Sequence, residues 1–144
     1  MKINVRAPLN TYDGSPVWLV PPQINKENGE IVREGEPMHL YDVLIQVSLQ
    51  PSASQKPYSQ REQIIRFALG YDTWKAKENG SGVINISRKV LEVVQDDICR
   101  IYAPIVGGQV LTMMGYTLED LAELFGDDMV DELRSMIGGS PKAS

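Results

Sequence analysis

Apolar positions in the first 36 residues come in short runs separated by turn-forming residues. Ile3 and Val5 alternate with polar neighbours, and residues 17–20 form a second apolar run that two prolines terminate. Proline cannot donate a hydrogen bond to a neighbouring strand, so it marks the end of a strand. Asn28-Gly29 is a strong hairpin signal, because both residue types tolerate a positive φ. The pattern predicts two small hairpins or one irregular three-stranded sheet.

Residues 40–49 fit two periodicities at once. Apolar residues at positions 40, 43, 44 and 47 fit a helix, whereas those at 43, 45, 47 and 49 fit a strand. Pro51, shortly after this stretch, is a common signal for the end of a helix. We therefore favour a helix and keep a strand as the alternative.

Two stronger helices are predicted further along the chain. Residues 59–77 begin with Ser59 and Glu62, which have the spacing of a capping box. Residues 87–103 repeat apolar side chains at spacings of three and four, before Pro104 interrupts the helix. An extended segment over residues 83–86 separates them. The residues expected in the core are Ile64, Ile65, Leu69, Leu91, Val94, Ile98, Ile101 and Val110.

The helix over residues 59–77 carries a second apolar line, formed by Phe67, Tyr71 and Trp74. This line lies beside the stripe that begins at Ile64 and Ile65, and a helix usually buries only one such face. We expect the aromatic line to contact either the sheet or a second protein chain.

The C-terminal part of the chain predicts an acidic helical hairpin. Thr117 is a good N-cap for a short helix that ends at Gly126, and Asp127 caps a second helix that ends at Gly138. The carboxylates expected on its outer face are Glu119, Asp120, Glu123, Asp127, Asp128, Asp131 and Glu132. Such a surface either attracts a basic protein partner or only keeps the protein in solution.

These elements together predict one α+β domain for the chain of 144 residues. A β-hairpin region over residues 1–36 precedes a mainly helical core over residues 38–114. The acidic helical hairpin over residues 116–138 follows, and residues 139–144 are expected to fray.

The charge distribution narrows the range of partners. The net charge is −5; residues 51–114 carry +2, and the last thirty residues carry −5. Nucleic acids and anionic membranes bind chiefly through Lys and Arg, so both are disfavoured. No apolar run reaches the length of about 18 residues that a membrane span needs. The single cysteine cannot form an internal disulfide, so we expect a protein of the cytosol, including a host cytosol, or of a virion.

The sequence contains no convincing group of catalytic or metal-binding residues. His39 is the only histidine, and Cys99 is expected to be an inert, packed thiol. Asp96 and Asp97 are adjacent on a helix and point apart, so we expect them on a solvated face. The aspartates of residues 127–131 fit the ordinary preference for acidic residues at a helix start. We expect no enzymatic activity, no cofactor and no metal site.

Parts of the chain resemble small tailed-bacteriophage proteins without an assigned function. The likeness rests on Asp42-Val43-Leu44, on the step from Val83 to Ser87, and on the stretch from Tyr102 to Val110. It covers about half of the chain and concerns packing, so it implies no functional residue. It implies a viral origin and either an assembly role or a role directed at the host.

Three classes of function follow from these observations. We expect a non-catalytic interaction protein, a phage structural or assembly factor that acts as an oligomer with itself or with other phage proteins. One alternative is an inhibitor of a host nucleic-acid enzyme, with the acidic hairpin as the mimic of phosphate. The other is a transcription regulator, because residues 117–126 resemble the first half of a helix-turn-helix, although the acidic second helix would repel phosphates.

Overall fold

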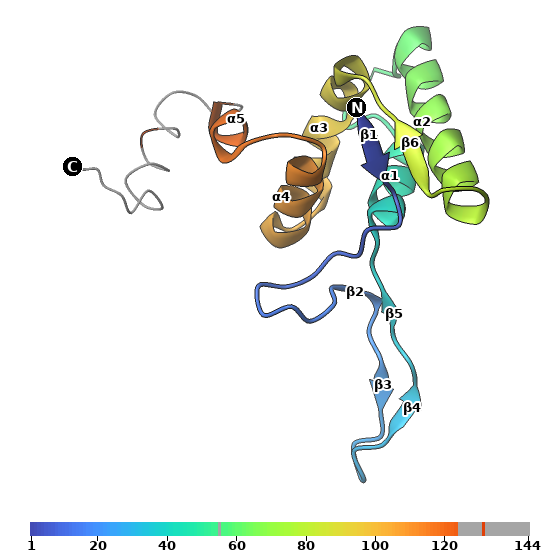
Figure 1. Ribbon diagram of the computed structural model, residues 1–144, viewed down its shortest axis with the longest axis vertical. Coiled ribbons are helices and arrows are strands. Elements are labelled where there is room, and N and C mark those ends of the chain that lie inside the picture. Colours follow the sequence, from blue (N-terminus) through green and yellow to red (C-terminus); the bar gives the residue numbers. More distant parts are fainter. Residues whose placement is uncertain (55, 124–130, 132–144) are drawn as a thin grey trace.

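The computed structural model describes residues 1–54, 56–123 and 131. It has an α+β fold, as the sequence predicts, with small antiparallel strand pairs and a helical body (Figure 1). The helices are α1 (Leu40–Leu49), α2 (Gln60–Glu78), α3 (Arg88–Ile101), α4 (Pro104–Met113) and α5 (Leu118–Glu123).

The helix boundaries follow local signals. Residues 40–49 form a helix, which confirms the favoured alternative, and the His39 N–H donates to the Asp42 carboxylate at 2.8 Å at its start. At the start of α2 the Ser59 hydroxyl accepts from the Glu62 N–H at 3.2 Å. Pro104 ends α3 and begins α4, where its missing N–H costs no helical hydrogen bond.

The first strand does not pair within the N-terminal region. β1 (Lys2–Asn4) pairs antiparallel with β6 (Val83–Asn85), and Ile3 lies opposite Ile84. Both side chains are buried in the core. The expectation that residues 1–36 form a sheet among themselves is therefore wrong for β1, since Ile84, which lies opposite Ile3, comes 81 residues later.

The remaining N-terminal strands form one long hairpin. β2 (Trp18–Val20) pairs with β5 (Glu36–Pro37), and β3 (Gln23–Ile24) pairs with β4 (Ile31–Arg33). Gly29 has a φ of +73°, so the turn predicted at Asn28-Gly29 is confirmed. The ribbon projects away from the helices and leads directly into α1 (Figure 1).

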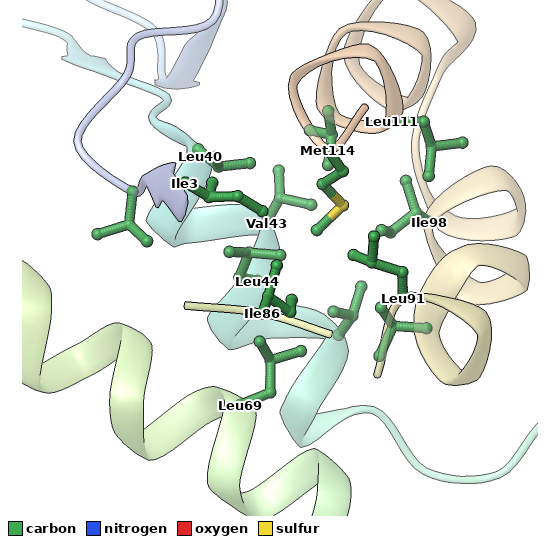
Figure 2. Packing of buried hydrophobic residues seen from close by; sticks show 14 of the residues in the cluster. Ile3, Leu40, Val43, Leu44, Leu69, Ile86, Leu91, Ile98, Leu111 and Met114 are labelled. Atoms are coloured by element: carbon green, nitrogen blue, oxygen red, sulfur yellow. The ribbon is translucent and has the colours of Figure 1, made fainter. Parts of the chain in front are cut away.

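The core lies where α1, α3, α4 and the β1–β6 pair meet, and Leu69 reaches it from α2 (Figure 2). Six of its fully buried side chains are Leu9, Leu40, Leu44, Leu91, Ile98 and Leu111. Of the predicted core residues, Leu69, Leu91, Val94, Ile98 and Val110 are buried, whereas Ile65 and Ile101 are half-buried. Ile64 is exposed, so its assignment to the core is wrong.

Candidate functional site

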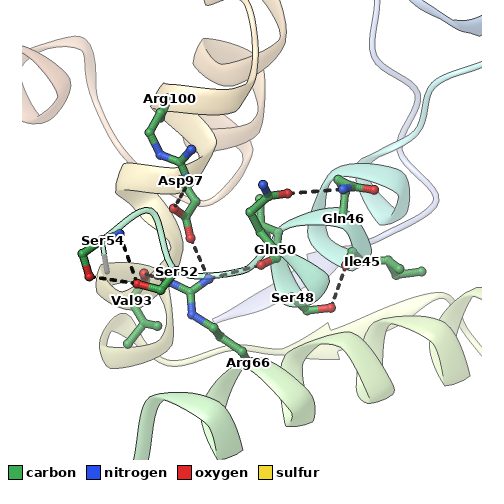
Figure 3. A network of polar contacts seen from close by, with 11 residues as sticks. Ile45, Gln46, Ser48, Gln50, Ser52, Ser54, Arg66, Val93, Asp97 and Arg100 are labelled. Carbon is green, nitrogen blue, oxygen red and sulfur yellow. Dashed lines mark hydrogen bonds and ion pairs between the residues drawn. The ribbon is translucent and has the colours of Figure 1, made fainter. Parts of the chain in front are cut away.

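The inward face of α2 carries an arginine. Arg66 is only 5% exposed and donates to the Asp97 carboxylate at 2.6 Å, to the Val93 carbonyl at 3.1 Å and to the Val47 carbonyl at 3.2 Å (Figure 3). Its guanidinium carbon lies 4.0 Å from the centre of the Tyr58 ring. Arg66 therefore ties α2 to both α1 and α3.

Asp97 is buried, which corrects the expectation of a solvated carboxylate. It accepts from Arg66 with one oxygen and from Arg100 with the other, at 2.7 Å. Two arginine partners supply the charge and the hydrogen bonds that a buried carboxylate requires. Asp96, next in sequence, is exposed as predicted.

Because Arg66 points inward, α2 turns a row of large apolar side chains to the solvent. Ile64, Phe67, Tyr71 and Trp74 are between 49% and 71% exposed. We name these four residues the outer stripe. Their spacings of three, four and three are those of the seam by which a helix contacts another helix in a coiled coil.

The aromatic members of the outer stripe contact one another. The ring centres of Phe67 and Tyr71 are 5.9 Å apart, and those of Tyr71 and Trp74 are 6.4 Å apart. The ammonium of Lys75 lies 5.4 Å from the centre of the Tyr71 ring. The structure thus brings together Phe67, Tyr71 and Trp74 as the sequence suggests, and adds Ile64 to them.

A shallow apolar groove of about 480 Å³ runs beside the outer stripe, between the end of α1 and α2. Its lining includes Ile45, Leu49 and Pro51 from α1 and the following loop, and Phe67, Tyr71 and Trp74 from α2. The two helices are close at Gly70, where an added Cβ would lie 2.3 Å from the Ser48 hydroxyl. We name this hollow the apolar groove.

A second, polar hollow of about 820 Å³ lies on the other side of α2, against α3. Its charged lining is balanced: Arg61, Arg66, Lys89 and Arg100 against Glu62, Glu92, Asp96 and Asp97. A balanced lining does not concentrate a field of one sign, so this hollow has no evident preference for an ionic ligand.

His39 and Cys99 line neither hollow. The His39 ring stacks on Tyr41 at 4.9 Å between ring centres and shares a hydrogen bond of 3.0 Å with its hydroxyl. Cys99 is exposed, which corrects the prediction of a packed thiol. Partial burial of the sulfur and the nearby Asp96 carboxylate raise the pKa of Cys99, which disfavours the reactive thiolate.

The predicted acidic surface is described only in part. Glu119, Asp120 and Glu123 lie on α5, and Asp131 is exposed. Asp127, Asp128 and Glu132 lie outside the described residues, as does the second helix predicted there.

The start of α5 shows that one of these carboxylates has a local role. The Asp120 carboxylate accepts from the Thr117 N–H at 2.8 Å, and the Thr117 hydroxyl accepts from the Asp120 N–H at 3.0 Å. The hydrogen bond that this carboxylate accepts from the Thr117 N–H is the main cause of the lowered pKa of Asp120. Thr117 is thereby confirmed as an N-cap, and Asp120 serves the helix start.

Within the described part of the chain, no helix is both long and apolar enough to cross a membrane. The same residues contain no group of three or more His, Cys, Asp or Glu side chains placed to hold a metal ion. No protein-family model matches the chain, and neither a curated protein nor a solved structure shows a significant match.

Proposed function

We propose that this chain is a non-catalytic interaction protein that acts in assembly as an oligomer, with the outer stripe and the apolar groove as its binding face. The observation that carries the proposal is the orientation of α2, which buries an arginine and exposes Ile64, Phe67, Tyr71 and Trp74. Water solvates an arginine well and large apolar side chains poorly. This arrangement is favourable when a partner covers the stripe.

Two further features support a macromolecular partner. Aromatic residues are enriched at the centres of protein interfaces, because they bury a large area with few rotatable bonds. The groove beside the stripe is open and mostly apolar, as expected for a surface that receives another protein segment. The resemblance to small tailed-phage proteins favours a partner within a phage assembly.

The experiment compares a stripe variant, Phe67→Ser with Trp74→Ser, with the unmodified chain. Both side chains are exposed, so the variant should keep its fold, which circular dichroism checks. We expect the variant to lose self-association in light scattering, or to lose the proteins that co-purify with the unmodified chain. Tyr12→Ser is the matched control, since Tyr12 is a highly exposed aromatic residue outside this face.

The proposal fails if the stripe variant equals the unmodified chain both in mass and in its co-purifying proteins. It also fails if Tyr12→Ser causes the same loss, because the effect would then reflect general surface hydrophobicity.

A further inference from the structure

The projecting hairpin is a second apolar surface that the chain does not cover. Ile24 and Ile31 face each other across the two strands near its tip and are 56% and 64% exposed. Its other exposed apolar side chains are Trp18, Leu19, Val20 and Val32. A two-stranded ribbon has no interior of its own and is marginally stable alone in water, so a covering partner would stabilise it.

The base of the hairpin is held firmly, which fixes the direction in which it points. The Val17 N–H donates to the Leu9 carbonyl at 2.9 Å, the Met38 N–H to the Val17 carbonyl at 2.7 Å, and the Leu9 N–H to the Met38 carbonyl at 3.0 Å. Leu9 is fully buried, and Val17 and Met38 pack against the core.

This direction keeps the tip away from the chain's own groove. The segment from Trp18 to Ile24 spans roughly 20 Å at the usual rise of an extended strand. In Figure 1 the ribbon extends away from α1 and α2, between which the groove lies. An intramolecular contact would require the hydrogen-bonded base to break.

The hairpin has a net charge of −2, because Lys26 and Arg33 offset two of its four glutamates, and a lysine lies at the edge of the apolar groove. Glu27, Glu30, Glu34 and Glu36 on the hairpin form no ion pair within the described residues. On α2, Lys75 likewise has no carboxylate partner among the residues described, whereas Arg61 lines the polar hollow on the other side of the helix. Lys75 lies beside Tyr71, which lines the groove. Charge complementarity of this kind orients two surfaces and speeds their encounter.

We propose that the hairpin of one copy docks into the apolar groove of a second copy, with the Ile24–Ile31 pair seated between α1 and α2. This inference rests on the proposed function, because it names the occupant of the same binding face. Each chain then offers one hairpin and one groove, so the contact is head-to-tail. Repetition of such a contact gives a closed ring, or an open filament where the rotation does not close.

The experiment uses two full-length variants that each lack one half of the contact. The hairpin variant is Ile24→Ser with Ile31→Ser, and the groove variant is Leu49→Glu with Phe67→Glu. All four side chains are more than half exposed, so the folded state should tolerate both changes, as circular dichroism would show.

We expect the unmodified chain to form oligomers at micromolar concentration and each variant alone to run as a monomer of 16.1 kDa. A mixture of the two variants should contain a 1:1 complex of twice that mass, because one intact hairpin meets one intact groove. The complex cannot grow, since its two remaining halves are both blocked. Light scattering coupled to gel filtration measures these masses.

The head-to-tail contact is excluded if the hairpin variant associates like the unmodified chain, or if the mixture stays monomeric. It is also excluded if the unmodified chain is a monomer in the micromolar range. In each of these cases the loss of another co-purifying protein from the stripe variant would still support the outer stripe as a binding face, whereas a monomeric unmodified chain would exclude action as an oligomer. Equal behaviour of the stripe variant and the unmodified chain would instead overturn both proposals.

Discussion

Arg66 loses its hydration when it is buried and gains hydrogen bonds inside the protein. Asp97 compensates for this loss, because it supplies the opposite charge as well as an acceptor. Both side chains are at least nine-tenths buried and meet at 2.6 Å. Removal of one partner from such a pair leaves the other as a buried, uncompensated charge, which is much more destabilising than the loss of a surface ion pair. The residue that orients α2 is thus also a vulnerable point of the fold.

We predict that Asp97→Asn lowers the free energy of unfolding by about 3–5 kcal/mol, because Arg66 then stays buried without a counter-charge. Asp96→Asn is the matched control, since Asp96 is exposed, and its effect should stay within about 0.5 kcal/mol. Urea denaturation of both variants measures the difference. Equal losses in the two variants would contradict the role given to the buried pair.

At the scale of elements, the end of α2 depends on a side chain from the N-terminal segment. The Arg6 guanidinium donates to the Lys77 carbonyl at 3.2 Å and to the Gly80 carbonyl at 3.3 Å. Carbonyl groups in the last turn of a helix lack partners within the helix, and a cation there also favours the helix dipole. Arg6 therefore connects the segment after β1 to the end of α2.

We predict that Arg6→Ala makes the last turn of α2 fray. Amide hydrogen exchange should become faster at Asn79, whose N–H donates to the Lys75 carbonyl at 2.8 Å. Exchange in α1 should not change, because Arg6 makes no hydrogen bond to that helix. The exchange rate at Asn79 in Arg6→Lys should lie between those of the unmodified chain and Arg6→Ala. Lysine keeps the charge but not the planar guanidinium, one terminal nitrogen of which donates to both carbonyls. Unchanged exchange at Asn79 in Arg6→Ala would contradict this role.

The elements also show which parts of the fold are readable from the sequence. Helix starts at Ser59 and Thr117 and the break at Pro104 are predicted correctly, because capping and the missing proline N–H act within a few residues. The pairing of β1 with β6 is not predicted, since it joins residues 79 to 83 positions apart and has no local signal.

The candidate site is only half predictable for a similar reason. Phe67, Tyr71 and Trp74 stand out as a line that one core cannot absorb, whereas Ile64 is assigned to the wrong face. Which face of α2 is buried depends on Arg66, which donates to Asp97, a residue 31 positions further along the chain. The heptad spacing from Ile64 through Trp74 is the signal that could have placed Ile64 in the stripe.

At the scale of the whole molecule, the ionisation of buried tyrosines makes the stability of the fold depend on pH in the alkaline range. Burial, reinforced by the Asp42 carboxylate, raises the pKa of Tyr102 from 10.0 to about 12. Burial also raises the pKa of Tyr41, Tyr58 and Tyr116. The folded state therefore holds these phenols in their neutral form over a range in which the unfolded chain ionises them.

We predict that the contribution of these tyrosines to the free energy of unfolding is constant below pH 10. This contribution falls as the pH rises from 10 through about 12. The sign follows from the raised pKa, because the unfolded state loses protons first and is then favoured. Denaturation at stepped pH values measures the fall. Tyr102→Phe should make it shallower, since phenylalanine cannot ionise, and an equally steep fall in this variant would argue against a contribution of Tyr102.

The β1–β6 pair has a consequence for the order of folding during synthesis. Residues 2–4 can find their strand partner only after residues 83–85 have left the ribosome. At a translation rate of about 5–20 residues per second, the first strand and the buried Val5 wait for several seconds without the rest of their core. The hairpin, whose strands are near neighbours, can close in microseconds in that interval. The hairpin of a nascent chain is thus exposed before the rest of the domain has folded. Neighbouring nascent chains could bind one another through it at this stage.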